Sequence, residues 1–283
     1  MKRIIKPIFV CAFYGSLFYS CNTTKDPNDA ILNDVTKVDS LEVAQAIVLE
    51  NKGLKLTEVV NSPAFLDSKL LLKSPKLDEY FEQGATKFEF SVKSSNYVLG
   101  ANSSDSKTKM CANSDKGQHI HVIVDNHPYE ASYDTNYTLK DQLQKGNHVA
   151  LAFLSRSYHE SIKHKNAYAL TQFTVGDEDM DKIDLNAPHL FYSRPKGEYK
   201  GADTENVMLD FYLVNTTIAK GGNYVQVTIN DTVEFKIEKW APYLIKGLPL
   251  GDNKIEIQLM NNAHKLIAGP YNAVEKQFTL IKK

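Results

Sequence analysis

The sequence predicts an all-β protein made of two tandem immunoglobulin-like β-sandwich repeats. Short runs such as KLLLKS, KFEFSV, VQVTI and KIEIQL alternate apolar with polar residues, and turn sequences such as GDN lie between them. A period of two indicates strands with one buried face. The chain also repeats itself, because Gln172-Phe173-Thr174 returns as Gln277-Phe278-Thr279, 105 residues later.

The N-terminus resembles a bacterial lipoprotein signal. A basic start and a short apolar run occupy residues 1–20, and small Ser20 precedes Cys21, the predicted site of lipidation. An acyl anchor would hold the protein at a membrane surface without spanning it. We therefore expect a cell-envelope protein, an outer-membrane lipoprotein, with a plain cleaved signal as the alternative. No later window approaches the roughly 20 apolar residues that a spanning helix needs.

Residues 21–66 are expected to form a tether with one short helix. The run Asp39-Ser40-Leu41-Glu42 resembles a capping box, and LEVAQAIVLENKG ends at Gly53, a typical C-terminal stop. The first repeat is then placed at residues 67–176, an acidic linker at 177–187, and the second repeat at 188–283. The linker begins like a calcium loop at Asp177, but Lys182 and Pro188 replace the glycine and glutamate that such a loop requires.

The repeat extends over three strands. The offset of 105 aligns the first strand of each set, and an offset of 106 aligns Val149, Leu151 and Phe153 with Ile255, Ile257 and Leu259. Units of about 100 residues with short strands have the size of an immunoglobulin-like sandwich. The Cys-Trp-Cys spacing of antibody domains is absent, so the prediction covers the architecture alone.

The charge and the cysteine content of the chain exclude some classes of ligand and bond. The formal net charge is -1, which argues against nucleic acid as a ligand. Of the three cysteines, Cys11 lies in the signal and Cys21 would carry lipid, so Cys111 remains alone without an internal disulfide.

Histidines are the main functional signal. In the strand at 117–125, His119 and His121 lie on the face opposite the aliphatic residues Ile120, Val122 and Val124. In the strand at 148–153 the same alternation would point Val149 toward the core and His148 away from it. The second repeat has Tyr224, Gln226 and Lys254 at the three histidine positions, so the fold does not require imidazoles there.

Two imidazoles at positions i and i+2 of a strand can share a transition metal. His148, His159 and Cys111 are further candidate ligands, and imidazole with a thiol favours copper or zinc as the cofactor. Ordinary surface histidines are the alternative interpretation.

The run SRSYHESIK offers a different chemistry. Arg156 and Lys163, with serines nearby, could hold a phosphate or carboxylate, while an exposed hairpin would have the same composition. Ser157, His159 and Glu160 are too close in sequence to face one another as a catalytic triad. A dyad of Cys111 and His119 stays open. On balance the sequence predicts a binding protein rather than an enzyme.

The segments CANSDKGQHIHVIVDN, FLSRSYHESIK, LFYSRPKGEY and VMLDFYLVNTT resemble a Bacteroidota lipoprotein family with two sandwich repeats, known as phosphopeptide-binding proteins. That resemblance implies a protein or phosphopeptide ligand held by Arg156, Lys163 and Arg194. The first repeat is also similar to a periplasmic histidine-rich sandwich domain, whose pattern covers Gly117, His119, His121, Asp125, Gly146 and His148. The chain departs from that pattern because it lacks a run of three histidines in the strand.

Overall fold

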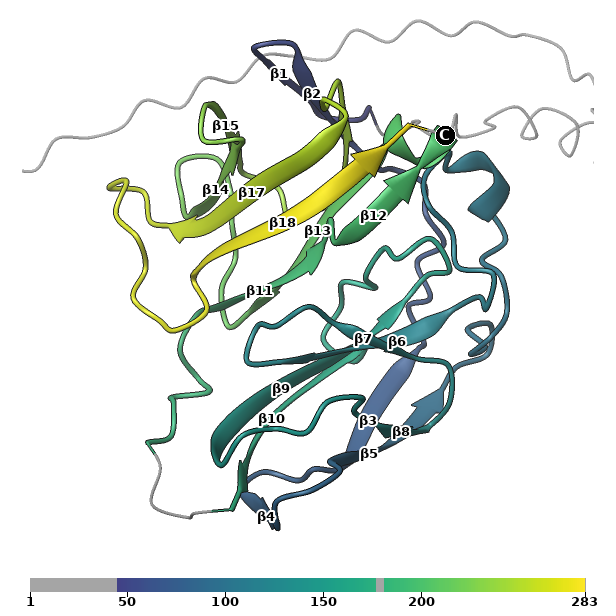
Figure 1. The fold of residues 1–283 in the computed structure, drawn as a ribbon, viewed down its shortest axis with the longest axis vertical. Coiled ribbons are helices and arrows are strands. Elements are labelled where there is room, and N and C mark those ends of the chain that lie inside the picture. The colour runs from purple at the N-terminus through teal and green to yellow at the C-terminus, as the bar shows by residue number, and fades with distance from the viewer. Residues whose placement is uncertain (1–44, 177–180, 283) are drawn as a thin grey trace, which may run out of the picture. The chain divides into compact units, whose positions relative to one another are not determined.

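The computed structural model describes residues 45–176 and 181–282, and regular structure there is almost entirely β (Figure 1). These residues form 18 strands and two 3-10 helices, at Ser106–Thr108 and Gly201–Thr204, and contain no α-helix. Within these two ranges no helix has the length and apolar character needed to span a membrane. The predicted all-β fold of two sandwiches is confirmed. The signal at 1–20, Cys21, the capping-box residues and Asp177 lie outside the described residues.

The first sandwich pairs a five-stranded sheet with a three-stranded one. The larger sheet has the order β4 (Glu79–Phe81), β10 (Tyr168–Val175), β9 (Gly146–Ser155), β6 (His119–Val124) and β7 (Glu130–Ser132). The smaller has the order β3 (Lys69–Ser74), β5 (Lys87–Lys93) and β8 (Asn136–Thr138). Alternate side chains of the two sheets meet in one core, which includes Phe88, Phe90, Ile120, Val122, Ala152, Leu154 and Phe173.

The second sandwich consists of two five-stranded sheets. One has the order β12 (Gly197–Lys200), β18 (Ala273–Ile281), β17 (Gly251–Met260), β14 (Tyr224–Ile229) and β15 (Val233–Ile237), and Figure 1 shows β17, β18 and β12 side by side. The other has the order β1 (Val48–Asn51), β2 (Leu54–Glu58), β16 (Tyr243–Lys246), β13 (Val207–Val214) and β11 (His189–Arg194). Their shared core includes Leu56, Leu209, Val227, Ile245, Ile257 and Phe278.

The strand pairs confirm the internal repeat but correct its register. In the first sandwich Ile120 pairs with Leu154, and in the second Val225 pairs with Leu259. From the first pair to the second, both residue numbers increase by 105. The offset of 106 inferred for Val149, Leu151 and Phe153 is therefore wrong. Ala150, Ala152 and Leu154 are the true counterparts of Ile255, Ile257 and Leu259, and they line the sandwich core. A slip of one residue moves every side chain of a strand to the opposite face.

The outer face of β6 and β9 is buried as well. Ile123, Val149, Leu151 and Phe153 pack against residues of β11 and β13, namely Phe191, Tyr212 and Val214. All six residues of β6 are consequently buried. With aliphatic side chains on both faces, the alternation pattern does not distinguish the sandwich core from the contact between the two sandwiches.

The short helix predicted before the first repeat is wrong for the residues that the structure describes. Asn51 pairs with Leu54 across a two-residue turn, in which Lys52 has φ 45° and Gly53 has φ 84°. Positive φ at both positions is the signature of a type I′ hairpin turn. Gly53 therefore closes a hairpin instead of ending a helix. Strand β2 continues this hairpin into the second sandwich by pairing with β16.

The described end of the predicted linker, residues 181–187, lies on the protein rather than apart from it. Lys182 Nζ is 2.7 Å from Asp78 Oδ1, and Ile183 and Leu185 pack against the contact between β9 and β13.

Candidate metal centre

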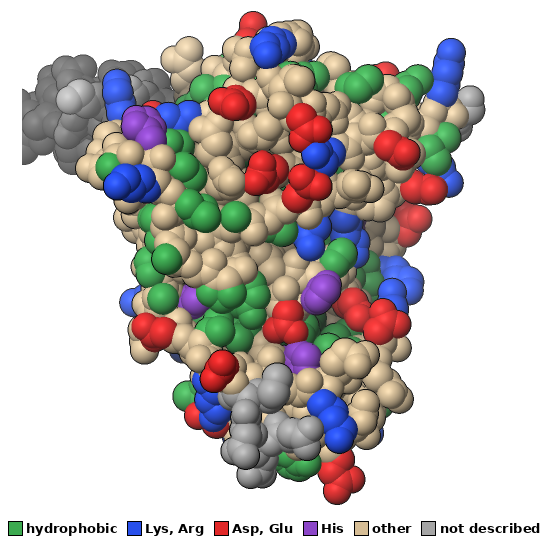
Figure 2. Space-filling model, turned by 60° about the vertical axis from the view of Figure 1, so that its left-hand side comes forward, with side chains coloured by type: hydrophobic (Ala, Val, Ile, Leu, Met, Phe, Trp, Pro, Cys, Tyr) green, Lys and Arg blue, Asp and Glu red, His purple; other side chains and the backbone are tan. Residues whose placement is uncertain are grey.

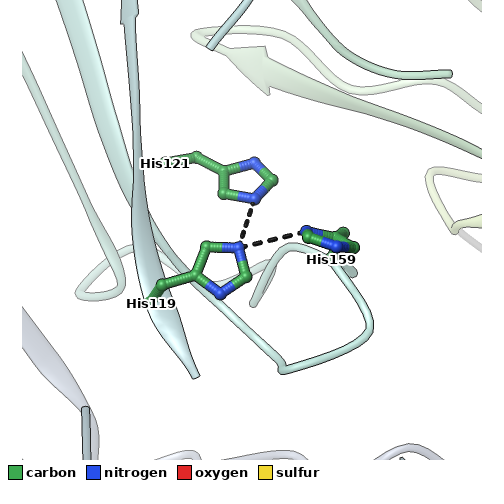
Figure 3. Close-up of side chains that lie close together, drawn as sticks. All are labelled: His119, His121 and His159. Carbon is green, nitrogen blue, oxygen red and sulfur yellow. Dashed lines mark hydrogen bonds between the residues drawn. The ribbon is translucent and has the colours of Figure 1, made fainter. Parts of the chain in front are cut away.

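Three histidines converge beside the start of β6. The Nε2 atoms of His119 and His121 are 2.9 Å apart, and His159 Nδ1 lies 3.2 Å from His119 Nε2. One nitrogen from each ring lies within 4.8 Å of the other two. Figure 3 shows His159 reaching from its turn toward the two strand histidines.

The fold itself brings His159 to this place. The turn between β9 and β10 is closed by hydrogen bonds from Arg156 N to Glu160 O and from His159 N to Arg156 O, both 2.9 Å long. His159 takes φ 69°, which points its ring back over β6. In the second sandwich His264 has φ 58° and its Nδ1 lies 2.8 Å from the hydroxyl of Tyr224, the counterpart of His119. The contact is thus common to both repeats, whereas the three imidazoles occur in the first alone.

The outer nitrogens of the two strand histidines are held by the protein. His119 Nδ1 donates to the carbonyl of Gly117 at 2.8 Å, which leaves the Nε2 lone pair directed at the other two rings. His121 Nδ1 lies 3.1 Å from Ser193 Oγ, on β11 of the second sandwich. Gly117 has φ 80°, and a Cβ there would come within 2.4 Å of the Gly100 carbonyl oxygen, so this position requires glycine.

Aromatic rings enclose the histidines. Tyr129 stacks on His121 with ring centroids 3.5 Å apart and an interplanar angle of 7°. Tyr133 lies 5.0 Å from the His119 ring. His119 and His121 are fully buried, at 0% exposure, whereas His159 is partly exposed and lines a cavity of about 840 Å³. On the face drawn in Figure 2, by contrast, histidine side chains reach the surface at separate places among interspersed acidic and basic residues.

Burial keeps these imidazoles neutral. It lowers the pKa of His119 to about 4, against the opposing effect of the Gly117 hydrogen bond. The pKa values of His121 and His159 are lowered well below 6.5, by burial first and then by neighbouring positive charge, including Arg194 and Lys196. At neutral pH the group therefore offers three uncharged nitrogen donors, the form in which histidine binds metals.

His148 does not join the group, which corrects the prediction from sequence. Its Nδ1 lies 2.6 Å from Asp125 Oδ2, and its Nε2 is 2.8 Å from the Gln144 carbonyl. The register explains the error, because His148 shares its face with Ala150 rather than with His121. In the second sandwich Asn253 and Asn230 make the corresponding contact at 2.9 Å. Burial lowers the pKa of His148, but the Asp125 and Gln144 contacts outweigh it and the net shift is upward.

Cys111 also lies outside the group of converging ligand atoms. The thiol is free and partly buried, and burial, with Glu160 second, raises its pKa to about 12. Arg194 and Lys109 lower the pKa of the thiol and Asp203 raises it, with smaller effects than burial and Glu160. The arrangement provides neither a thiolate ligand nor the activated thiol that a dyad with His119 would need.

The cations predicted to hold a phosphate are already engaged. Arg156 is buried, its Nε donates to the Pro63 carbonyl at 3.0 Å, and its Nη1 pairs with Glu160 Oε1 at 2.9 Å. Lys163 pairs with the fully buried Asp210. The exposed hairpin expected for SRSYHESIK is therefore wrong, since residues 155–158 are buried.

Arg194, the third predicted cation, is buried and donates to two tyrosine hydroxyls. Its Nε is 3.0 Å from the Tyr129 oxygen, and its Nη1 is 3.0 Å from that of Tyr199. Tyr129 also lies 3.3 Å from His159 Nδ1 through its hydroxyl. Arg194 is consequently part of the surroundings of the histidine group, not a surface anion site.

Comparison with models of protein families found no match, and comparison with curated proteins found none either. Among solved structures, the fibronectin(III)-like modules of Clostridium thermocellum CbhA are 12% identical and cover 75% of this chain and 94% of their own, with a TM-score of 0.26. The central fibronectin-III array of RIM-binding protein is 10% identical and covers 80% and 71%, with a TM-score of 0.25. A Bacteroides ovatus SGBP-B in complex with a mixed-linkage heptasaccharide is 8% identical and covers 75% and 47%, with a TM-score of 0.22. TM-scores this low support no functional inference, and the family resemblance seen in the sequence stays a prediction.

Sequence reasoning missed the residues that surround the histidines. Ser193, Tyr129 and Tyr133 carry no motif, and Ser193 belongs to the other repeat, 72 positions from His121. The one indirect indication is that Ser193 precedes Arg194 in a strand with apolar residues at both odd and even positions, a pattern that indicates a strand buried on both faces.

Proposed function

We propose that the protein binds a transition metal ion, copper or zinc, through His119, His121 and His159. The observation that carries the proposal is the convergence of three neutral imidazole nitrogens in a buried position. Zn–N bonds of about 2.0–2.1 Å place two nitrogens of a tetrahedral centre roughly 3.3 Å apart. The separations of 2.9 and 3.2 Å from His119 Nε2 to the other two rings are close to that value, and all three ligand nitrogens lie within 4.8 Å of one another, so binding would draw the remaining pair closer together.

The contacts behind the ligands support the same proposal. Histidines that bind metals usually hold their outer nitrogen in a hydrogen bond to a carbonyl, carboxylate or hydroxyl group, which fixes the tautomer and the ring orientation. His119 has such a bond to Gly117 and His121 to Ser193. The donors are all imidazoles, which suits zinc or copper and not calcium or magnesium.

The proposed role is binding at the cell envelope rather than catalysis. The lipid anchor at Cys21 belongs to the proposal and is supported by the residues of the N-terminus alone. Mass spectrometry of the protein extracted from membranes would detect acylation at Cys21. A phosphopeptide ligand has less support, because Arg156 and Lys163 are committed to internal partners.

The direct test is titration of purified, untagged protein with zinc, copper(II) and copper(I), followed by calorimetry and metal analysis. We expect one ion per chain. His121→Gln should weaken binding by about 100-fold or more, since loss of a supporting contact alone costs about 10- to 100-fold. Glutamine is chosen because Gln226 occupies the corresponding position of the second repeat.

A second variant and a matched control make the test specific. His159→Asn should also abolish stoichiometric binding, and asparagine tolerates the positive φ of this position. His264→Asn makes the same change in the same turn of the second repeat and should leave binding intact. Absence of metal uptake above background, or equal loss in the His264 variant, would refute the proposal.

A further inference from the structure

Two cations that pair with no carboxylate of residues 45–176 or 181–282 lie next to the histidine group. Arg194 is 8% exposed, and its hydrogen bonds go to the uncharged hydroxyls of Tyr129 and Tyr199. Lys196 Nζ donates to the Tyr129 carbonyl at 2.5 Å and lies 3.9 Å from the centroid of its ring. Neither cation takes part in an ion pair among the described residues.

This arrangement leaves the charge of a bound metal uncompensated. The ligand group contains no carboxylate and no thiolate, so a dication would keep its full charge beside Arg194 and Lys196. Tyr129 links both cations to the group: its ring stacks on His121, its hydroxyl lies 3.3 Å from His159 Nδ1 and accepts from Arg194, and Lys196 lies over the same ring. Buried charges are stable in proteins when opposite charge accompanies them.

The cavity beside His159 has room for the missing negative charge. Its volume is about 840 Å³, and His159, Tyr129 and Lys196 line it together. Three acidic residues, Asp115, Glu130 and Asp134, line it as well. The Glu130 carboxylate accepts hydrogen bonds from Tyr137 and from the Lys140 amide, and Asp134 accepts from the Thr135 amide. Asp115 is exposed, where solvent screens its charge.

We infer that the centre takes its metal together with a small exogenous anion, a carboxylate or an inorganic monoanion, which occupies the open coordination position and contacts Lys196. Three protein ligands with one open position are the arrangement that lets a metal bind an external ligand. The inference rests on the proposed metal binding. It adds a specific role for Lys196, which is not a ligand of the metal itself.

The test uses copper(II)-loaded full-length protein and azide, an anion whose bonding to copper(II) produces a visible charge-transfer absorption. We expect saturable azide binding, and Lys196→Gln should weaken it by about 10- to 100-fold, the loss expected for a hydrogen bond to a charged group. Lys196→Arg should keep the affinity close to that of the unmodified protein. The control Lys140→Gln removes an exposed cation from the rim of the same cavity and should have little effect.

Each outcome decides one point. Stoichiometric copper binding without an azide band would overturn the inference and leave the proposed metal site intact. Equal weakening by Lys196→Gln and Lys140→Gln would show a general charge effect and overturn the contact with Lys196. Failure of the protein to bind either copper or zinc in the titrations would refute the proposed function and this inference together. Acetate competing with azide would assign the position to carboxylates, whereas chloride competing alone would assign it to inorganic monoanions.

Discussion

Ser193→Ala tests whether the second sandwich takes part in metal binding. The serine hydroxyl contacts His121 Nδ1 at 3.1 Å, and both side chains are buried. Replacement by alanine removes one oxygen atom and leaves that nitrogen without its partner. The change alters no proposed ligand, so any effect on the metal must act through the orientation of the His121 ring.

The expected size follows from the geometry. Loss of a contact that orients a ligand typically costs about 10- to 100-fold in metal affinity, or roughly 1.4–2.8 kcal/mol. The metal-free protein should lose about 1–3 kcal/mol of unfolding free energy as well, because a buried nitrogen is left unsatisfied.

Calorimetric titration with zinc and urea denaturation of the metal-free protein measure the two effects separately. Ser68→Ala is the matched control, since this buried serine contacts Nε2 of His164, an imidazole outside the histidine group, at 3.2 Å. It should lower stability similarly while changing zinc affinity by no more than about 0.5 kcal/mol, the usual limit for independent sites. Unchanged zinc affinity in Ser193→Ala, or an equal loss in the control, would refute the assigned role of Ser193.

Three further predictions follow from the charged and titratable groups. Because burial lowers the pKa of His119 to about 4 and those of its two partners well below 6.5, these three histidines bind more protons in the unfolded chain than in the folded protein below pH 6.5. Stability of the metal-free protein should therefore fall from pH 6.5 toward pH 4, by up to about 1.4 kcal/mol per pH unit for each histidine, and equal urea midpoints at pH 7 and pH 5 would contradict this. The raised pKa of His148 acts with the opposite sign, since the stability it contributes is present below pH 6.5 and is lost as the pH rises through its folded value. Arg156→Ala should cost about 3–5 kcal/mol by leaving Glu160 buried without its partner, and Arg156→Ala with Glu160→Gln should recover part of that loss in urea denaturation; a fully stable single variant would argue against a structural role. The pair Asp125→Asn and His148→Asn copies the contact of the second repeat, so zinc affinity should stay unchanged, and a large loss would reinstate His148 near the metal.

The period of two and the internal repeat were sufficient to predict the sandwich architecture, because both depend on side-chain alternation along single strands. They were not sufficient to assign faces. Strand β9 has bulky apolar side chains at Val149, Leu151 and Phe153 as well as small or apolar residues at Ala150, Ala152 and Leu154. The set that begins with Ala150 packs inside the first sandwich, and the set that begins with Val149 packs against the second repeat. The sequence favours the bulkier set as the core, and the resulting slip of one residue misplaced His148.

The site was predictable in part for a similar reason. His119 and His121 share a face because of strand geometry alone, but that geometry does not indicate where His159 lies. Its approach to His119 depends on a turn with positive φ, which histidine adopts uncommonly and which no local motif indicates. Ser193 and Arg194 belong to the second repeat. The alternation of apolar and polar residues along a strand does not indicate which outer sheet face of one sandwich contacts the other sandwich.

The hairpin of β1 and β2 sets the route by which the chain enters the molecule. Residues 48–58 complete a sheet of the C-terminal sandwich, and the chain then crosses to the N-terminal one before it returns. A force applied at the N-terminal side of residue 45 must first separate β1 from β2, which are joined by four residue pairs. It must then break the pairing between β2 and β16. Such a force therefore acts on the C-terminal sandwich before it reaches the sandwich that contains the histidines. Cleavage of the chain at residue 188 would separate the C-terminal sandwich from two of its strands, β1 and β2.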